Sequence, residues 1–186
     1  MNDNVHIFEN FLSSQECNLI LNKCKTELTL DRALTSGGDV SGINTHIRKS
    51  SIAWVRELDF LNERLILKLK NSFNIAGMEA VGLGKFQFTE YKVGEYYNWH
   101  IDTINTKPDG RFASAVLLLN DEYSGGKLEI KNTNNELIPL IYNIGTLFIF
   151  KSDLLHRVTP VEKGVRYSLV NWVSLVKTDS KKQNLL

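Results

Sequence analysis

The sequence predicts a mainly β domain of the α+β class, with N-terminal helices packed on one face of the β structure. Two segments in the first 80 residues repeat apolar residues at helical spacing. From residue 82 onward, short apolar or alternating runs are separated by Gly, Asn, Asp or Pro turns. Many short strands at near-regular spacing are typical of a sandwich, a jelly roll or a barrel.

The chain length suits one domain with a substantial core. It has 186 residues, of which 42% are hydrophobic and 23% are charged. With 22 Lys+Arg against 21 Asp+Glu, the formal net charge is +1, so there is no overall basic field for nucleic acid. Four His and two Cys exclude a Cys-rich zinc ribbon or a disulfide scaffold.

The first helix is expected to begin after Ser13. Ser13 and Glu16 have the spacing of a capping box. The residues that follow on one apolar face are Cys17, Ile20, Leu21, Cys24 and Leu28. The two cysteines lie two helical turns apart, roughly 10 Å, which is too far for a disulfide. A reduced, cytoplasmic protein is therefore expected.

The beginning of the chain and its apolar runs predict neither export nor membrane insertion. Residues 1–7 contain no basic region followed by an apolar stretch, as a secretion signal would. No apolar run approaches the roughly 18 residues of a membrane span.

A second helix is expected from about Asp59 to Phe73, because Leu58, Leu61, Leu65, Leu69 and Phe73 repeat at threes and fours. Between the two helices, the Gly- and Ser-rich segment Thr35–Asn44 predicts a flexible loop that could close over a substrate. It leads into a predicted strand at Ile47–Val55.

The second half of the chain supplies most of the predicted strands. They are expected at Leu83–Glu90, Phe112–Leu119, Lys127–Ile130, Leu137–Ile141, Thr146–Phe150, His156–Thr159 and Val165–Val173. We therefore expect one domain over residues 1–176, with a helical part at about 1–80 and a β core at about 82–173. Residues 177–186 are predicted to be a polar tail.

The most informative short motif is His100-Ile-Asp102. On a strand, residues two apart share a face, so the imidazole and the carboxylate would lie side by side. His156, at the start of another predicted strand, is the only histidine well placed to join them. Two His and one carboxylate on one face form a facial triad that holds Fe(II) and leaves positions open.

Arg166 and Ser168 follow ten residues later and would also share one strand face. An Arg fork binds a carboxylate in bidentate fashion, and a Ser hydroxyl adds a hydrogen bond. A 2-oxo acid co-substrate needs such an anchor at its far end. Each of these motifs alone is common on ordinary strands; their joint occurrence, in this order, indicates a metal site. For His6 and His46 we expect a plain surface role.

Several segments together resemble the non-haem Fe(II), 2-oxoglutarate-dependent dioxygenases, specifically the prolyl 4-hydroxylase-like branch. The segment from Tyr91 to Asp102 is similar to the family's Tyr, Gly, Tyr, His-x-Asp pattern. Gly125-Gly126-Lys-Leu128 resembles its Gly-Gly-x-Leu strand opening, and residues 145–168 resemble its distal-His and co-substrate block. Arg48-Lys-Ser50 with Trp54 resembles a stretch just upstream of the core. The matches cover about residues 47–173.

The resemblance implies a double-stranded β-helix, a distorted jelly roll, with iron at one open end. It implies His100, Asp102 and His156 as iron ligands, and Arg166 as partner of the distal carboxylate of 2-oxoglutarate. Ser168 would assist Arg166, and Tyr91 would donate its hydroxyl to the same co-substrate. The residues that would line the substrate mouth are Arg48, Trp54, Tyr97, Trp99 and Trp172; core packing is the alternative for each Trp and for Tyr91.

The implied activity is hydroxylation of an unactivated C–H bond, coupled to decarboxylation of 2-oxoglutarate to succinate. Fe(II), 2-oxoglutarate and O₂ are the implied cofactor and co-substrates, with ascorbate as a candidate reductant. A prolyl residue of a protein or peptide is the first substrate expected; a free amino acid or small metabolite is second, and a modified nucleobase third.

Three features depart from the family pattern. Many members have Lys where Arg166 stands, but Arg keeps the ion pair. Val116–Leu119 offers no hydroxyl, although some prolyl hydroxylases have a co-substrate Tyr near Leu118. No peptide-binding domain is visible beyond the core. Two other classes stay open: a cupin-like metal-binding module without O₂ chemistry and an inactive interaction domain. The oligomeric state is left open.

Overall fold

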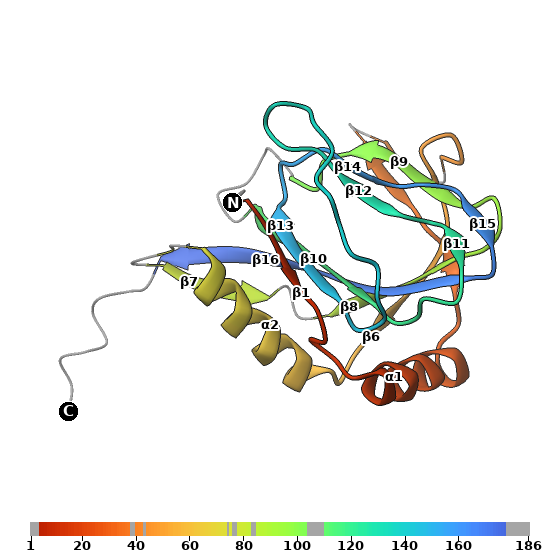
Figure 1. Ribbon diagram of the computed structural model, residues 1–186, viewed down its shortest axis with the longest axis horizontal. Coiled ribbons are helices and arrows are strands. Elements are labelled where there is room, and N and C mark those ends of the chain that lie inside the picture. The colour runs from red at the N-terminus through yellow and green to blue at the C-terminus, as the bar shows by residue number, and fades with distance from the viewer. Residues whose placement is uncertain are drawn as a thin grey trace.

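Two facing β-sheets, two further two-stranded sheets and two helices make up the described fold (Figure 1). The computed structural model describes residues 4–37, 40–42, 44–73, 75, 78–82, 85–103 and 110–177. The helices are α1 (Ser14–Glu27) and α2 (Asp59–Ser72). The strands are β1 (Val5–Phe8), β2 (Asp31–Arg32), β3 (Thr35–Gly37), β4 (Val40–Gly42), β5 (Arg48–Lys49), β6 (Ser51–Val55), β7 (Met78–Gly82), β8 (Phe86–Tyr91), β9 (Tyr96–His100), β10 (Arg111–Leu118), β11 (Ser124–Gly125), β12 (Leu128–Ile130), β13 (Leu147–Lys151), β14 (His156–Val158), β15 (Val161–Lys163) and β16 (Arg166–Lys177).

The large sheet has the order β1-β13-β10-β16-β8-β6-β2, and β7 pairs with the far part of β16. Both helices lie on one side of this sheet (Figure 1). Their buried residues share one apolar cluster with the sheet face beneath them. Among the buried residues of this cluster are Cys17, Ile20, Cys24, Leu61, Leu65 and Leu69 from the helices and Leu117, Ile149 and Leu169 from the sheet. The predicted helix-on-sheet arrangement is confirmed.

The small sheet, of order β12-β14-β9-β5, lies on the opposite side of the large one. A second apolar cluster fills part of the space between the sheets. It joins Val116, Leu118, Phe148 and Phe150 of the large sheet to Leu128 and Ile130 of the small one. Along β10 and β13, alternate residues thus face the helices or the small sheet, which explains why both strands are mostly apolar.

The capping box of α1 forms as predicted. The Glu16 amide donates to Ser13 Oγ at 3.2 Å, and the Ser13 amide donates to Glu16 Oε2 at 2.8 Å. Cys17 and Cys24 are free and buried. Burial raises the pKa of each thiol to about 11. Neither helix in the described part of the chain is long and apolar enough to cross a membrane.

The N-terminal part contains more strand than the sequence indicated. β1 pairs with β13 at the edge of the large sheet, and His6 lies on it with its ring 4.6 Å from Phe73. A packed ring therefore replaces the surface role expected for His6, while His46 is exposed as expected. Within the predicted loop at 35–44, β3 and β4 pair as a hairpin; residues 38, 39 and 43 lie outside the described residues.

One predicted strand does not form. Across 137–141, the only ladder contact described is an isolated bridge between Lys131 and Leu137. Pro139 has no amide hydrogen to donate to a ladder. The apolar residues that alternate along this segment have another role: Ile138, Leu140 and Tyr142 pack against the apolar cluster between the sheets. Of the predicted tail, residues 178–186 lie outside the described residues.

Candidate active site

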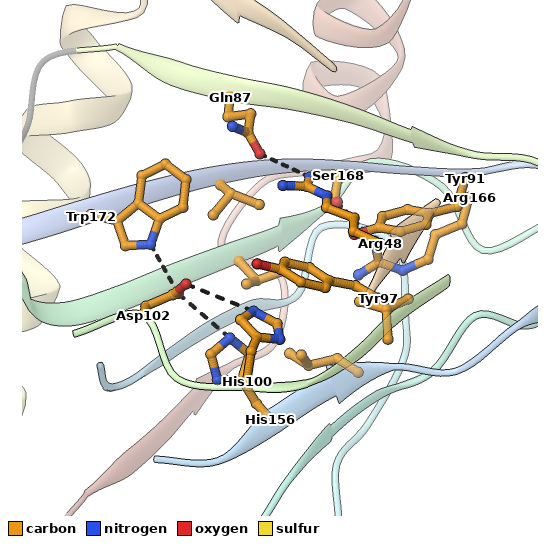
Figure 2. A pocket seen from close by; sticks show the side chains of 14 residues that line it. Arg48, Gln87, Tyr91, Tyr97, His100, Asp102, His156, Arg166, Ser168 and Trp172 are labelled. Atoms are coloured by element: carbon orange, nitrogen blue, oxygen red, sulfur yellow. Dashed lines mark hydrogen bonds and ion pairs between the residues drawn. The ribbon is translucent and has the colours of Figure 1, made fainter. Parts of the chain in front are cut away.

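A pocket between the two sheets brings together most of the predicted site residues (Figure 2). Its lining comes from both sheets, with the polar side chains of each turned inward. The lining residues are Arg48, Gln87, Tyr91, Tyr97, His100, Asp102, Val116, Leu128, His156, Val158, Arg166, Ser168, Val170 and Trp172. The site thus combines a cluster of metal-ligand side chains with two buried guanidinium groups.

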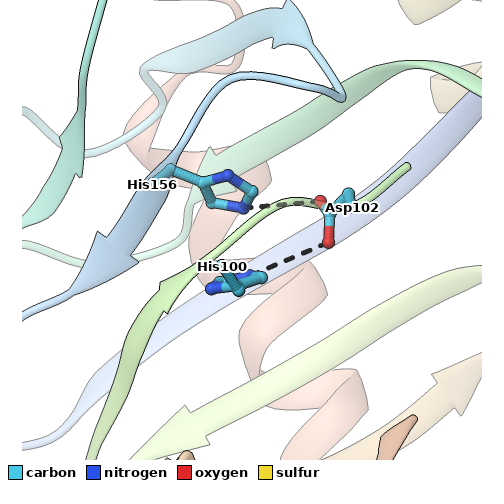
Figure 3. Close-up of side chains that lie close together, drawn as sticks. All are labelled: His100, Asp102 and His156. Atoms are coloured by element: carbon cyan, nitrogen blue, oxygen red, sulfur yellow. Dashed lines mark ion pairs between the residues drawn. The ribbon is translucent and has the colours of Figure 1, made fainter. Parts of the chain in front are cut away.

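His100, Asp102 and His156 lie at one end of the two central strands of the small sheet. His100 ends β9, Asp102 follows it by two residues, and His156 begins β14 directly opposite His100. His100 Nε2 lies 3.7 Å from Asp102 Oδ1, and His156 Nε2 lies 3.5 Å from Asp102 Oδ2 (Figure 3). All three side chains offer ligand atoms within 4.8 Å of one another, as a common metal ion requires.

Backbone carbonyl groups orient both imidazoles. His100 Nδ1 is 2.7 Å from the Asn98 carbonyl oxygen, and His156 Nδ1 is 2.9 Å from that of Leu154. A carbonyl oxygen only accepts, so each Nδ1 carries the hydrogen and each Nε2 keeps its lone pair. Metal-ligating histidines are commonly held by such a second hydrogen bond. Both Nε2 atoms are therefore ready to bind a cation.

The electrostatics of the cluster favour the forms that bind metal. Burial, followed by repulsion from His156, lowers the pKa of His100 to about 3, so this imidazole is neutral near pH 7. Burial opposes ionisation of Asp102, but its interactions with His156, and then with His100 and the Ser114 hydroxyl, hold its carboxyl pKa below the usual range. A neutral imidazole and an ionised carboxylate need no deprotonation at neutral pH before they bind a cation.

A β-bulge shapes the wall beside His100. Val158 pairs with Tyr97 and His156 with His100, so two steps along β14 match three steps along β9. The shift places Tyr97 on the face of His100, where the two rings stack at 3.5 Å. Trp99 lies outside the pocket lining, with Lys131 at 4.8 Å and Arg157 at 4.6 Å from its ring.

Arg166, Ser168 and Tyr91 meet at the other end of the pocket. The Arg166 side chain is only 1% exposed, and its Nη1 donates to Ser168 Oγ at 2.8 Å. Its Nε and Nη2 have no partner among the described residues. The guanidinium lies 5.4 Å from the Tyr91 ring. Two unused donors on a buried cation fit an incoming carboxylate, which this site would recognise in bidentate fashion.

Gly126 makes room for this arginine. A Cβ built at Gly126 would lie 3.1 Å from Arg166 Cδ and 2.9 Å from Val161 Cγ2, and its φ is +54°. Both the space and the backbone conformation therefore require glycine here. The Gly-Gly pair noticed in the sequence supports the position of Arg166.

The five side chains predicted for the substrate mouth divide into two groups. Arg48, Tyr97 and Trp172 line the pocket, whereas Trp54 and Trp99 do not. Trp54 is 49% exposed, and its ring lies 6.2 Å from that of Trp172.

Arg48 reaches the pocket because β5 pairs with β9, and it is buried. Its Nε donates to Ser50 Oγ at 2.8 Å and its Nη2 to Gln87 Oε1 at 3.1 Å. Its guanidinium also lies 4.7 Å from the centre of the Tyr97 ring. All of these partners are neutral.

Three polar residues at the site were not predicted: Gln87, Arg111 and Ser114. Gln87 shares the face of Tyr91 on β8, so alternation from Tyr91 could have identified it. Ser114 is a polar residue inside the apolar β10, and its hydroxyl donates to Asp102 Oδ2 at 2.7 Å. Arg111 lies in β10 with its guanidinium 3.9 Å from the Trp172 ring; nothing in its sequence context identified it.

Comparisons with known proteins agree with this geometry. Residues 86–174 match the family model of the 2OG-Fe(II) oxygenase superfamily. A PKHD-type hydroxylase of Shewanella baltica is 34% identical over 105 residues, which cover 53% of this chain and 46% of the relative. A PKHD-type hydroxylase of Gloeothece citriformis is 30% identical over 124 residues, covering 63% and 55%. The chain spans about half the length of the curated relatives it matches.

Solved structures show the same fold. A prolyl-4-hydroxylase of Pseudomonas putida superposes with a TM-score of 0.73 at 22% identity, over 92% of each chain. A prolyl hydroxylase of Trichoplax adhaerens, solved with a fragment of the oxygen degradation domain of hypoxia inducible factor, has a TM-score of 0.75 at 22% identity, over 92% of this chain and 84% of that one. The predicted distorted jelly roll is confirmed.

Proposed function

We propose that the protein is a 2OG-Fe(II) oxygenase that hydroxylates an unactivated C–H bond, because residues 86–174 match the family model of that superfamily. The balanced reaction is R–H + 2-oxoglutarate + O₂ → R–OH + succinate + CO₂. One observation carries the proposal. A two-His, one-carboxylate cluster and a buried guanidinium with two unused donors line the same pocket.

The residues present fit the implied cofactor. Two imidazole nitrogens and one carboxylate are the ligand set of non-haem Fe(II) oxygenases. His100, Asp102 and His156 would hold the ion, which supplies O₂ binding and the redox chemistry when it is bound. Arg166 and Ser168 would bind the distal carboxylate of 2-oxoglutarate, with Tyr91 beside them.

The rest of the pocket controls water and the substrate. The apolar side chains of Val116, Leu128, Val158 and Val170 line it between the two charged ends. Excluding water here strengthens the ion pair at Arg166 and protects reactive intermediates. Arg48, Tyr97 and Trp172 line the same pocket and would meet the substrate. Trp54, close to Trp172, would extend this wall outward.

For the substrate, we propose a prolyl residue of a protein or peptide. The likeness to two prolyl hydroxylase structures, one of them with a peptide fragment, supports this choice. A free amino acid or small metabolite is the second candidate. A cupin-like module without O₂ chemistry would need no oxo-acid anchor, and the unused donors of Arg166 favour the oxygenase. We propose that residues 1–176 act as one unit.

The first experiment tests the co-substrate. Fe(II) and then 2-oxoglutarate are added to the purified protein without oxygen, and the visible spectrum is recorded. A weak metal-to-ligand charge-transfer band is expected, because 2-oxoglutarate would chelate the iron. Arg166→Ala should weaken 2-oxoglutarate binding and keep Fe(II) binding, whereas His100→Ala should lose both. Bound Fe(II) without the band in the unaltered protein would refute the co-substrate.

The second experiment tests the substrate. Succinate release is measured with 2-oxoglutarate, ascorbate and O₂ against prolyl peptides, free amino acids and small metabolites. Succinate formed in proportion to hydroxylated prolyl peptide supports the first candidate. Coupled turnover only with free amino acids or metabolites would replace it with the second.

A further inference from the structure

The carboxylate of Asp102 is held by donors from two neighbouring strands of the large sheet. Ser114 Oγ on β10 donates to Asp102 Oδ2 at 2.7 Å, and Trp172 Nε1 on β16 donates to the same oxygen at 2.9 Å. Ser114 and Trp172 are direct cross-strand partners in the β10–β16 ladder. Figure 2 shows the indole nitrogen pointing at Asp102 from across the pocket. The two donors therefore form one rigid platform behind the predicted ligand.

Ser152 connects to Asp102 by two routes. Its carbonyl oxygen accepts from the Asp102 amide at 2.8 Å and from the Thr103 amide at 3.1 Å. Its hydroxyl lies 3.0 Å from Ser114 Oγ. Since the single Ser114 proton is donated to Asp102, the Ser152 hydroxyl donates to Ser114. Ser114 and Ser152 are both at most 1% exposed, so bulk water is kept from competing for these bonds.

The arrangement distinguishes the two oxygens of Asp102. An ionised carboxylate has about four lone-pair sites, two on each oxygen. Ser114 and Trp172 occupy both sites of Oδ2, and His156 Nε2 lies 3.5 Å from the same oxygen without donating to it. Oδ1 has His100 Nε2 at 3.7 Å and Arg111 Nη1 at 3.9 Å, and neither is at hydrogen-bond distance. Oδ1 is thus the oxygen left for a cation.

We propose that Ser114, Trp172 and Ser152 are positioning residues that turn Asp102 Oδ1 toward the metal and keep this ligand monodentate. A monodentate carboxylate leaves open the positions that a chelating co-substrate and O₂ need. Ser152 precedes His156 by four residues, so one short segment orients the carboxylate and also carries the third ligand. The proposal rests on the proposed function, because it requires a metal at the triad.

Metal binding and the ligand field test the proposal without turnover. Co(II) is titrated into the metal-free protein, and affinity and the visible spectrum, which reports coordination number, are recorded. Ser114→Ala should weaken Co(II) binding by about 10- to 100-fold, the usual effect of losing an outer hydrogen bond to a ligand, and change the band intensities. Ser114→Thr keeps the hydroxyl and should restore the unaltered spectrum. Ser152→Ala should act in the same direction, but less strongly.

Two further variants complete the experiment. Trp172→Phe removes the N–H donor but keeps an aromatic ring, and should also weaken Co(II) binding. Ser72→Ala is the matched control, because this hydroxyl bonds only within α2, to the Lys68 carbonyl oxygen. Its Co(II) affinity and spectrum should be unchanged. Thermal unfolding of each metal-free variant identifies those that fold.

The outcomes separate the two proposals. If the unaltered protein binds no Co(II), the proposed function fails first. If it binds Co(II), and a folded Ser114→Ala or Trp172→Phe variant keeps both the affinity and the spectrum, the positioning role is wrong. Weaker Co(II) binding and an altered spectrum in either folded variant support the positioning role. For Ser114, the Ser114→Thr variant should then restore both the affinity and the spectrum.

Discussion

Replacement of Arg166 by methionine should stabilise the metal-free protein and abolish tight co-substrate binding. The side chain is almost fully buried and makes one hydrogen bond, to Ser168. Its Nε and Nη2 have no partner within the described structure. A buried donor without a partner destabilises a protein, so this arginine is costly until a carboxylate binds it. Methionine keeps much of the apolar stem and removes the charge.

The magnitude follows from counting donors. Each unpartnered buried group costs about 1–3 kcal/mol, and two of them disappear with the substitution. The lost bond leaves Ser168 Oγ without its partner, which offsets about one of these contributions. The free energy of unfolding should therefore rise by about 1–3 kcal/mol. For 2-oxoglutarate, two charge-assisted hydrogen bonds at about 1.5–3 kcal/mol each are lost, which weakens binding by about 10²- to 10⁴-fold.

Two measurements test this pair of opposite effects. Urea unfolding of the metal-free protein gives stability, and calorimetric titration of the metal-loaded protein without oxygen gives 2-oxoglutarate affinity. Arg166→Lys is the control, because it keeps one charge but loses the fork, and should show intermediate affinity. A methionine variant that is destabilised and still binds 2-oxoglutarate like the unaltered protein would show that Arg166 is purely structural.

Three other outcomes are expected. Gly126→Ala should lower 2-oxoglutarate affinity, measured by the same titration, because the new methyl group crowds Arg166 Cδ; unchanged affinity would contradict this. Cys17 and Cys24 should resist alkylation at pH 8 until the protein unfolds, and rapid labelling of the folded protein would refute this. The free energy of unfolding should fall between about pH 9 and 11, because the thiols ionise first in the unfolded protein, whereas burial raises their pKa in the folded protein to about 11. Trp99→Ala should leave both metal and 2-oxoglutarate affinity unchanged, because the ring lies outside the pocket lining; a loss of either affinity would show that Trp99 acts on the site.

Strand alternation predicted correctly that Arg166 and Ser168 lie together. Arg166 and Ser168 share a face of β16 as expected, and Val170 and Trp172 continue the same side into the pocket. This works because β16 is central in the large sheet and its ladders with β8 and β10 are uninterrupted along this stretch. A strand paired on both sides cannot slip without moving all of its side chains to the other face.

Alternation failed on β9, for a reason that the sequence does not display. Simple alternation places Tyr97 and Trp99 on one face and His100 on the other. The extra residue of the bulge reverses this relation, so Tyr97 joins His100 and Trp99 turns away. The bulge arises from pairing with β14, more than fifty residues later in the chain. Neither segment alone contains that information.

The hydrogen bonds behind Asp102 show why the candidate metal ligands were predictable and their supporting residues were not. Metal chemistry restricts the ligands to few residue types, so His100, Asp102 and His156 stand out in a sequence with four histidines. A supporting group can be a serine hydroxyl, an indole N–H or a backbone carbonyl oxygen, and all three types contact Asp102 here. Ser114 can be identified because it lies in the buried, mostly apolar part of β10, where a hydroxyl requires a hydrogen-bond partner. A lone polar residue in such a strand is therefore the signal to look for beside a predicted metal ligand.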